Sequence, residues 1–196
     1  MNFRIRKLFC KNRDIIVVIL LLNLVAIPTF SQKLIKTKIA KGVIVEIPEG
    51  LIPMSKEDIT QQFPTQRDPL GAYISEDRLA YFSVNWAWSK WPDGDEMKAK
   101  GFLKAGILNL FDGVKMIDEG IKMVHKKKFV YFEFESRISG KKEGDVNLGT
   151  ILKYTYIQYF ISAKRTLVFT FSCQQNISSK WQEETKRMMS SVKIRQ

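Results

Sequence analysis

Three tryptophans, Trp86, Trp88 and Trp91, lie close together in the sequence. In an extended strand, Trp86 and Trp88 face the same side as Phe82 and Val84, because side chains alternate with a period of two residues. Rings arranged in this way can form the wall of a groove that binds a carbohydrate or an apolar ligand. The same stripe is typical of core packing beneath a helix, and its continuation through Phe82 and Val84 favours the core. Trp91 follows in a loop, so we expect it to be the most exposed of the three.

Lysine and arginine residues recur in short clusters at 126–128, 141–142, 164–165 and 186–187. Such clusters can attract a protein to an anionic membrane surface, a phosphorylated glycan or an acidic protein. They can equally solvate turns and the outer faces of helices, and their positions between predicted elements favour this simpler interpretation. Lys126, Lys127 and Lys128, together with the three tryptophans, form the candidate binding surface. Nucleic acid is not an expected partner, because the chain has no helix-turn-helix, zinc or RNP pattern.

The residues that could support catalysis or bind a metal are few. Glu133 and Glu135 share one face of a predicted strand and could act as acid and base in a hydrolase, but carboxylates at this spacing are as common on a solvated sheet face. His125 precedes three lysines, which disfavour a protonated imidazole, and zinc would lack a second histidine. The run from Asp93 to Glu96 resembles a calcium loop without its distal glutamate. We therefore expect no catalytic residue, no cofactor and no metal site.

Three helices are predicted. The first begins after Ser55, which can form a reciprocal capping box with Asp58. The second begins near Asp93 and ends at Gly113, which suits the left-handed C′ position. The third begins at Ser178 or Ser179. Helical spacing predicts that the second helix buries Ala99, Leu103, Ile107, Leu110 and Phe111, and that the third buries Trp181, Thr185, Met188 and Val192.

Alternating apolar residues predict strands at 43–47, 72–75, 79–88, 114–118, 121–124, 129–138, 151–162 and 166–173. Short polar turns between several of them imply antiparallel hairpins, and 139–150 is the one long loop. Cys173 shares a strand face with Leu167 and Phe169, so we expect a buried thiol. Strands that cluster between helices in this order predict an α+β fold with an antiparallel sheet.

Residues 1–31 have the pattern of a signal peptide. A basic start leads into an apolar run from Ile15 to Ile27, which is shorter than the roughly 20 residues that span a bilayer. Small residues then suit cleavage after Ser31, and an uncleaved anchor is the alternative. Cleavage would leave Cys173 as the only cysteine, so we expect no internal disulfide.

The whole chain has 196 residues, of which 45% are hydrophobic, with 32 Lys and Arg against 20 Asp and Glu. This apolar content excludes a disordered chain, and the length favours one domain. We therefore divide the chain into a signal peptide over 1–31, a loose or strand-like N-terminal arm over 32–42 and a single domain over 43–196.

The order of elements resembles the PsbP/Mog-like superfamily, which includes the photosystem subunit PsbP, the Ran-binding Mog proteins and exported DcrB-like proteins. The resemblance rests on the first strand at 45–50, the Gly-Phe-Leu run at 101–103 and the amphipathic ending at 181–194, and it covers most of 43–194. The chain departs from its relatives at 125–128, where an Asn-Gly type of turn is common. The resemblance implies an α/β/α sandwich with a central antiparallel sheet flanked by helices.

The resemblance also implies a binding or assembly protein without catalytic residues. We therefore expect an exported, non-enzymatic module of the bacterial cell envelope that engages an envelope protein or an anionic surface through a groove and basic patches. One alternative is a carrier of a small apolar or carbohydrate ligand in a groove lined by the tryptophans. A second is a hydrolase that uses Glu133 and Glu135.

Overall fold

The computed structural model describes residues 32–195 apart from 65–66, 90, 93, 141, 144–145 and 148, and it leaves out the side chains of 142–143 and 146–147. The predicted signal peptide and its cleavage site lie outside the described residues. Gln32–Gln196 forms one compact unit.

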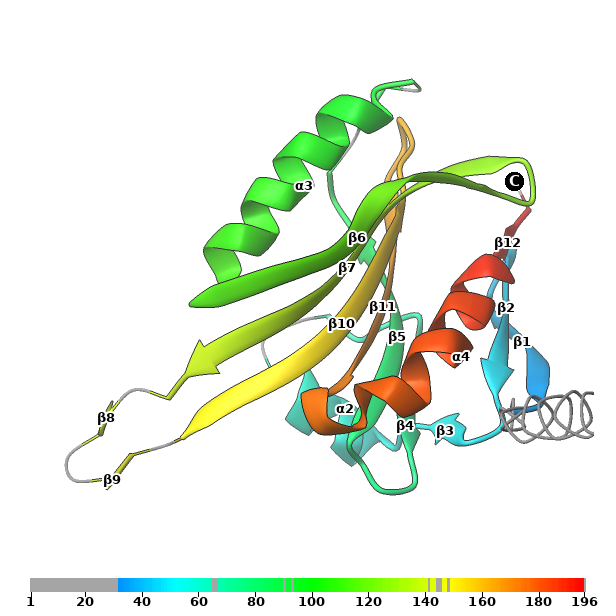
Figure 1. Cartoon of the computed structure of the whole chain (residues 1–196). Coiled ribbons are helices and arrows are strands. Elements are labelled where there is room, and N and C mark those ends of the chain that lie inside the picture. The colour runs from blue at the N-terminus through cyan, green and yellow to red at the C-terminus, as the bar shows by residue number, and fades with distance from the viewer. Residues whose placement is uncertain are drawn as a thin grey trace, which may run out of the picture. The chain divides into compact units, whose positions relative to one another are not determined.

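A seven-stranded antiparallel sheet forms the centre of this unit (Figure 1). Its strand order is β3-β4-β5-β11-β10-β7-β6. The bounds are β3 Leu51–Pro53, β4 Gly71–Ser75, β5 Ala80–Ala87, β6 Gly113–Val124, β7 Lys127–Ser139, β10 Thr150–Phe160 and β11 Thr166–Gln174. A second sheet joins β1 Leu34–Ala40, β2 Val43–Pro48 and β12 Lys193–Ile194, and a short pair joins β8 Lys142–Glu143 to β9 Val146–Asn147.

Helices cover both faces of the large sheet (Figure 1). Helix α3 (Glu96–Leu110) packs on β6 and β7, while α4 (Ser178–Ser190) packs on the opposite face, between the sheet and β2. The short α2 (Lys56–Gln62) lies near β4, on the same face as α3. We call the two sides the α3 face and the α4 face. This arrangement confirms the predicted α/β/α sandwich with a central antiparallel sheet.

The main core lies on the α4 face. Strand β11 turns Phe169, Phe171 and Cys173 to this face, where each is at most 1% exposed, so the predicted burial of Cys173 is confirmed. Trp181 and Met188 cover them from α4 and are as deeply buried. Because a fully buried large apolar side chain contributes about 1.5–3 kcal/mol, this contact holds α4 on the sheet.

Two helix predictions are confirmed. Ser55 Oγ accepts a hydrogen bond from the backbone N–H of Asp58 at 3.1 Å, and an Asp58 carboxylate oxygen accepts one from the backbone N–H of Ser55 at 3.2 Å. The stripe predicted for the last helix is buried: Trp181, Thr185 and Met188 lie on α4, and Val192 follows the end of the helix.

The prediction for the start and end of α3 was wrong. Its N-cap is Asp95, without a side-chain cap bond, and Asp93 lies outside the described residues. Phe111 at the C-cap has an extended backbone, so the chain enters β6 directly and Gly113 pairs in that strand without a positive φ. Leu110 is 73% exposed rather than buried, because the helix contacts the sheet through the stripe that contains Ala99 and Ile107.

Several strand boundaries also differ from the prediction. The segments 114–118 and 121–124 form one strand, β6, with an irregularity between Met116 and Asp118. The segment 139–150 includes β8 and β9, and Leu34–Ala40 of the expected arm pairs with β2. Strands β3 and β12 were not predicted, because two or three residues are too few to show a periodic pattern.

The β6–β7 hairpin turns through His125 and Lys126, with Val124 opposite Lys127. Both turn residues have positive φ, 45° and 65°. A two-residue turn of this hand matches the right-handed twist of the strands and is normally built from Asn and Gly. Here two residues with side chains adopt it, at a cost of about 1–2 kcal/mol for each residue in the left-handed region.

Replacing Lys126 by glycine (Lys126→Gly) should therefore raise the free energy of unfolding by about 1 kcal/mol, measured by urea denaturation. Lys126→Ala is the matched control, because it removes the same side chain but keeps the Cβ atom, and it should give no such gain. Equal effects of both variants would contradict the backbone explanation.

Candidate functional site

The six predicted surface residues all lie near one end of the large sheet. Ala87 pairs with Thr166, and Tyr159 pairs with Val130. These registers place the end of β5, the β10–β11 turn and the β6–β7 turn at the same end of the sheet. Lys128 Nζ lies 3.8 Å from a carboxylate oxygen of Glu96, which places the start of α3 there too. We call this region the basic end.

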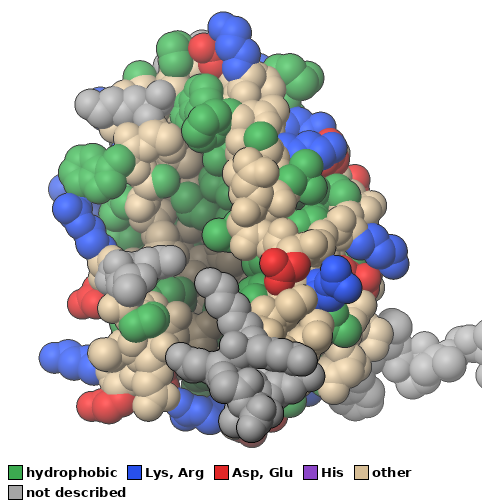
Figure 2. Space-filling view, turned by 90° about the vertical axis from the view of Figure 1, so that its left-hand side faces the viewer, with side chains coloured by type: hydrophobic (Ala, Val, Ile, Leu, Met, Phe, Trp, Pro, Cys, Tyr) green, Lys and Arg blue, Asp and Glu red, His purple; other side chains and the backbone are tan. Residues whose placement is uncertain are grey.

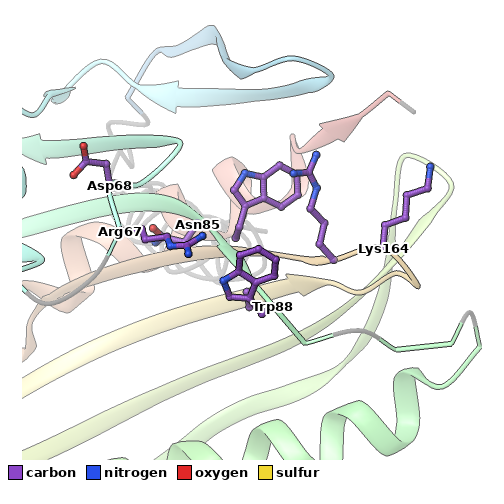
Figure 3. Close-up of a pocket in the computed structure, with 8 residues that line it drawn as sticks. Arg67, Asp68, Asn85, Trp88 and Lys164 are labelled. Atoms are coloured by element: carbon purple, nitrogen blue, oxygen red, sulfur yellow. The ribbon is translucent and has the colours of Figure 1, made fainter.

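A cavity of about 540 Å³ opens at the basic end, where β4 stops pairing with β5 at Val84. Trp86 and Trp88 line it, together with Arg67, Asp68, Asn85, Ala87, Lys164 and Arg165 (Figure 3). The last residues of β5 therefore keep β11 as a neighbour, but within the described part of the chain no strand pairs with them on the other side. We call this the Trp–Arg cavity.

The favoured interpretation of the tryptophans as core was wrong for Trp86 and Trp88, which are 38% and 76% exposed. They continue the stripe of buried Phe82 past Val84, where the pairing of β5 with β4 ends. Trp91 was expected to be the most exposed, but it is half-buried and its ring packs edge-on against Phe102 of α3, with ring centroids 5.6 Å apart.

Guanidinium groups cover the exposed rings. Arg165 Cζ lies 3.2 Å from the centroid of the Trp86 ring, and Arg67 Cζ lies 5.0 Å from that of Trp88. Such contacts contribute about 0.5–1 kcal/mol at exposed sites. With Lys164 also lining the cavity and Asp68 as its acidic member, the cavity has more positive than negative charge. It presents N–H donors and aromatic edges, a combination suited to an anionic group.

The three lysines do not form one surface. Lys126 lies in the turn and is exposed. Lys127 is half-buried, with Nζ 5.9 Å from the centroid of the Phe160 ring, whereas Lys128 pairs with α3. Lys127 and Lys128 belong to β7, where alternation sends neighbouring side chains to opposite faces, so the three ammonium groups do not all project from the hairpin end.

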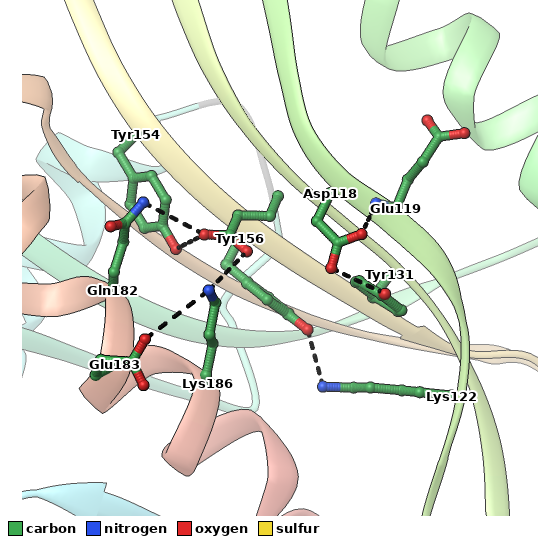
Figure 4. A network of polar contacts seen from close by, with 10 residues as sticks. Asp118, Glu119, Lys122, Tyr131, Tyr154, Tyr156, Gln182, Glu183 and Lys186 are labelled. Atoms are coloured by element: carbon green, nitrogen blue, oxygen red, sulfur yellow. Dashed lines mark hydrogen bonds and ion pairs between the residues drawn. The ribbon is translucent and has the colours of Figure 1, made fainter.

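Glu133 and Glu135 have different partners. Glu133 is fully buried beneath α4; its Oε1 accepts a hydrogen bond from the Tyr154 hydroxyl at 3.0 Å, and its Oε2 lies 3.5 Å from Lys186 Nζ (Figure 4). The Glu135 carboxylate instead pairs with Lys115 of the edge strand β6 at 3.4 Å. This arrangement favours a structural role for Glu133 over acid-base chemistry shared by the two carboxylates.

Sequence analysis missed a half-buried lysine beside this glutamate. Lys122 Nζ donates to the Tyr156 hydroxyl at 2.8 Å and lies over the stacked rings of Tyr131 and Tyr156 (Figure 4). Burial lowers the pKa of Lys122 to about 8, although Asp118 and Glu133 act in the opposite direction. The signal in the sequence was a set of polar residues on the core-facing side of otherwise apolar strands.

The pH dependence of stability tests this burial. In the unfolded chain Lys122 keeps a pKa near 10.5, whereas the folded protein releases the proton at about pH 8. The unfolded state then binds more protons, so stability rises with pH from about 8 upward. The free energy of unfolding of the wild type minus that of Lys122→Met should therefore rise between pH 7 and 9, as measured by chemical denaturation at each pH. A flat difference would mean that the ammonium group is solvated.

The fold and the site define a class: a small α+β domain with an antiparallel sheet between helices and a basic, aromatic cavity at one end. No family model and no curated protein matches the sequence. The solution structure of the cyanobacterial PsbP from Synechocystis sp. PCC 6803 is similar at a TM-score of 0.55 and 11% identity, over 83% of this chain and 93% of that one. The Ran-binding protein Mog1p of Saccharomyces cerevisiae is similar at a TM-score of 0.51 and 11% identity, over 84% and 96%.

This chain therefore has the fold shared by PsbP and Mog1p, and the predicted PsbP/Mog-like resemblance is confirmed at the level of the fold. Within the described part of the chain, no helix has the length and apolar character needed to cross a membrane.

Proposed function

We propose that this chain is an exported, non-enzymatic binding module of the bacterial cell envelope. Its recognition surface is the Trp–Arg cavity together with the exposed Lys126, and its partner is an acidic segment of an envelope protein. The observation that carries the proposal is the pair of exposed tryptophans, Trp86 and Trp88, each in contact with an arginine side chain.

Tryptophan and arginine are the residues most enriched among those that dominate the energy of protein interfaces. Trp88 exposes 76% of its surface to water, and a partner that covered this ring would gain the free energy of burying it. Arg67, Lys164 and Arg165 surround it and complement carboxylates. The basic end therefore has the anchor and the charge that an acidic protein segment requires.

The comparisons support a protein partner. Mog1p is named as a Ran-binding protein, so this fold serves protein binding in at least that relative. Identity of 11% transfers the fold and not the partner.

The carrier of a small ligand remains the alternative. A volume of about 540 Å³ is large enough for a small ligand. However, the guanidinium of Arg165 occupies one face of the Trp86 ring, so an apolar ligand would have to displace a cation. This favours an anionic partner over an apolar one. A hydrolase that uses Glu133 is disfavoured because its carboxylate is buried beneath α4.

Export has its own test. When the full chain is produced in an export-competent bacterial host, intact-mass spectrometry of the envelope fraction should show loss of residues 1–31 and a new N-terminus at Gln32. Recovery of the uncleaved chain in the membrane would support the anchor instead.

Affinity capture from the native envelope tests the binding surface. The tagged mature chain should capture a partner. The Trp88→Ala and Arg165→Gln variants should each bind this partner at least about tenfold more weakly, since residues that dominate an interface contribute about 2 kcal/mol or more. Raising the salt concentration should weaken capture by the wild type.

Two variants serve as controls. Ile151→Ala removes another exposed apolar side chain, 50% exposed near the opposite end of the sheet, and Lys36→Gln removes an exposed charge of β1. Both should retain the partner as the wild type does. Equal retention by all four variants, each shown to be folded by circular dichroism, would contradict the proposed surface.

A further inference from the structure

A second concave surface lies on the α3 face of the sheet, over β5, β11 and β10, and has a volume of about 450 Å³. Figure 2 views the molecule from the side that carries α3, where hydrophobic side chains gather beside a hollow. The strands beneath this surface are interior strands of the sheet, and the hydroxyls of Thr155 and Ser172 already bond each other at 3.1 Å. These described strands therefore present no open edge to a partner there, whereas the Trp–Arg cavity lies beside one.

The open edge is the side of β5 that β4 leaves uncovered. Along an antiparallel strand, alternate residues direct their backbone N–H and C=O groups to opposite neighbours. Ala80 directs both groups to β4, where Ser75 Oγ accepts a bond from its N–H and donates one to its C=O. The C=O of Val84 also points to this side and accepts a bond from the N–H of Leu70 at 2.8 Å. Trp86 lies two residues further on, so its N–H and C=O point the same way, and no backbone group of the described residues bonds them there.

The sequence does not protect this edge against pairing. Natural proteins protect strand edges with charged residues, proline or bulges. Residues 85–88 are Asn-Trp-Ala-Trp, with neither a charged residue nor a proline. Strand β6, at one edge of the large sheet, differs: it has an irregularity between Met116 and Asp118, and the side chain of its Lys115 is 78% exposed. The end of β5 is therefore better suited to an added strand than β6.

We infer that the acidic segment of the partner binds in extended form, as an added strand beside the end of β5 that pairs with the backbone of Trp86. This inference rests on the proposed function and specifies how the partner binds. In such complexes the backbone bonds supply affinity, and the side chains of alternate residues supply specificity. Arg67 and Arg165 line the cavity that the strand would enter, so its carboxylates can bond to these guanidinium groups.

Charge and backbone geometry disfavour two other occupants. A second copy of this chain that paired edge to edge would bring two sets of Arg67, Lys164 and Arg165 together, and like charges across an interface oppose association. A helical segment bonds its own backbone groups internally. It would cover Trp86 without bonding the N–H and C=O groups at the open edge, and a buried backbone group without a partner is costly. An extended acidic segment satisfies both the charge and the backbone.

Synthetic peptides test the added strand. The probe is fluorescein-labelled EVEVEVE amide, and its binding to the mature chain, the compact unit Gln32–Gln196, is measured by fluorescence polarisation. N-methylation of its valines removes the N–H donors along one edge of the peptide, and N-methylation of the glutamates that follow them removes those along the other, without changing the charge. One methylated form should raise Kd at least about tenfold, and the other should leave Kd within about threefold. Equal effects of the two forms would overturn the inference.

Amide hydrogen exchange, followed by NMR with and without the EVEVEVE peptide, shows where the peptide pairs. The N–H of Trp86 should exchange rapidly in the free chain and at least about tenfold more slowly with the peptide bound, because a paired amide exchanges only when the pairing opens. Ala87 is the internal control. Its N–H belongs to the set that faces β11, as does the C=O of Leu79, which accepts a bond from Gln174, so it should be protected in both states. A Trp86 N–H that is protected without peptide, or that the peptide leaves unchanged, would overturn the inference.

The added strand and the proposed function fail in different ways. If Trp88→Ala and Arg165→Gln each lose the peptide but both methylated forms bind as the parent does, the recognition surface stands and the added strand is overturned. If the peptide protects Trp86 but binds both variants as it binds the wild type, the added strand stands and the contribution of the two side chains is contradicted. Absence of peptide binding at about 1 mM would overturn the added strand, while partner capture from the envelope would still decide the proposed function.

Discussion

Burial of one side of strand β11 against helix α4 is the interaction on which the rest of the structure depends. Phe169 and Phe171 are fully buried there, and burial of each contributes about 1.5–3 kcal/mol. Because side chains alternate along a strand, the same register must turn Thr170 and Ser172 to the opposite face. A slip by one residue would place these hydroxyl groups in the core and the aromatic rings in water. The aromatic core on one face and the row of hydroxyl side chains on the other are thus two consequences of a single register.

The two concave surfaces differ in charge because they are built from different parts of the sheet. The Trp–Arg cavity lies where strands end and turns begin, and turn residues such as Lys164 and Arg165 can remain charged because water reaches them. The second surface, on the α3 face over β5, β11 and β10, lies over interior strands, where an unpaired charge would be costly and short hydroxyl side chains satisfy one another. The fold therefore leaves one concave surface whose charged side chains are mainly cationic and one that is nearly uncharged.

Two predictions that needed only neighbouring residues were confirmed, although the predicted caps of α3 were not. The capping box of Ser55 and Asp58 requires contacts three residues apart, and the buried stripe of α4 follows from helical spacing. Predictions that needed distant residues were less accurate. The exposure of Trp86 depends on where β4 stops beside β5, and the partial burial of Lys122 depends on tyrosines from two other strands.

The sequence by itself determined which side chains share a face and the approximate extents of the longer strands and of two helices. Alternation and helical spacing are local properties of the backbone, so they can be read without knowledge of the partners. Only the tertiary structure decided what covers each face. Phe82 and Trp86 lie on the same stripe of β5, yet one is sealed by the core and the other is exposed, because β4 flanks β5 only as far as Val84.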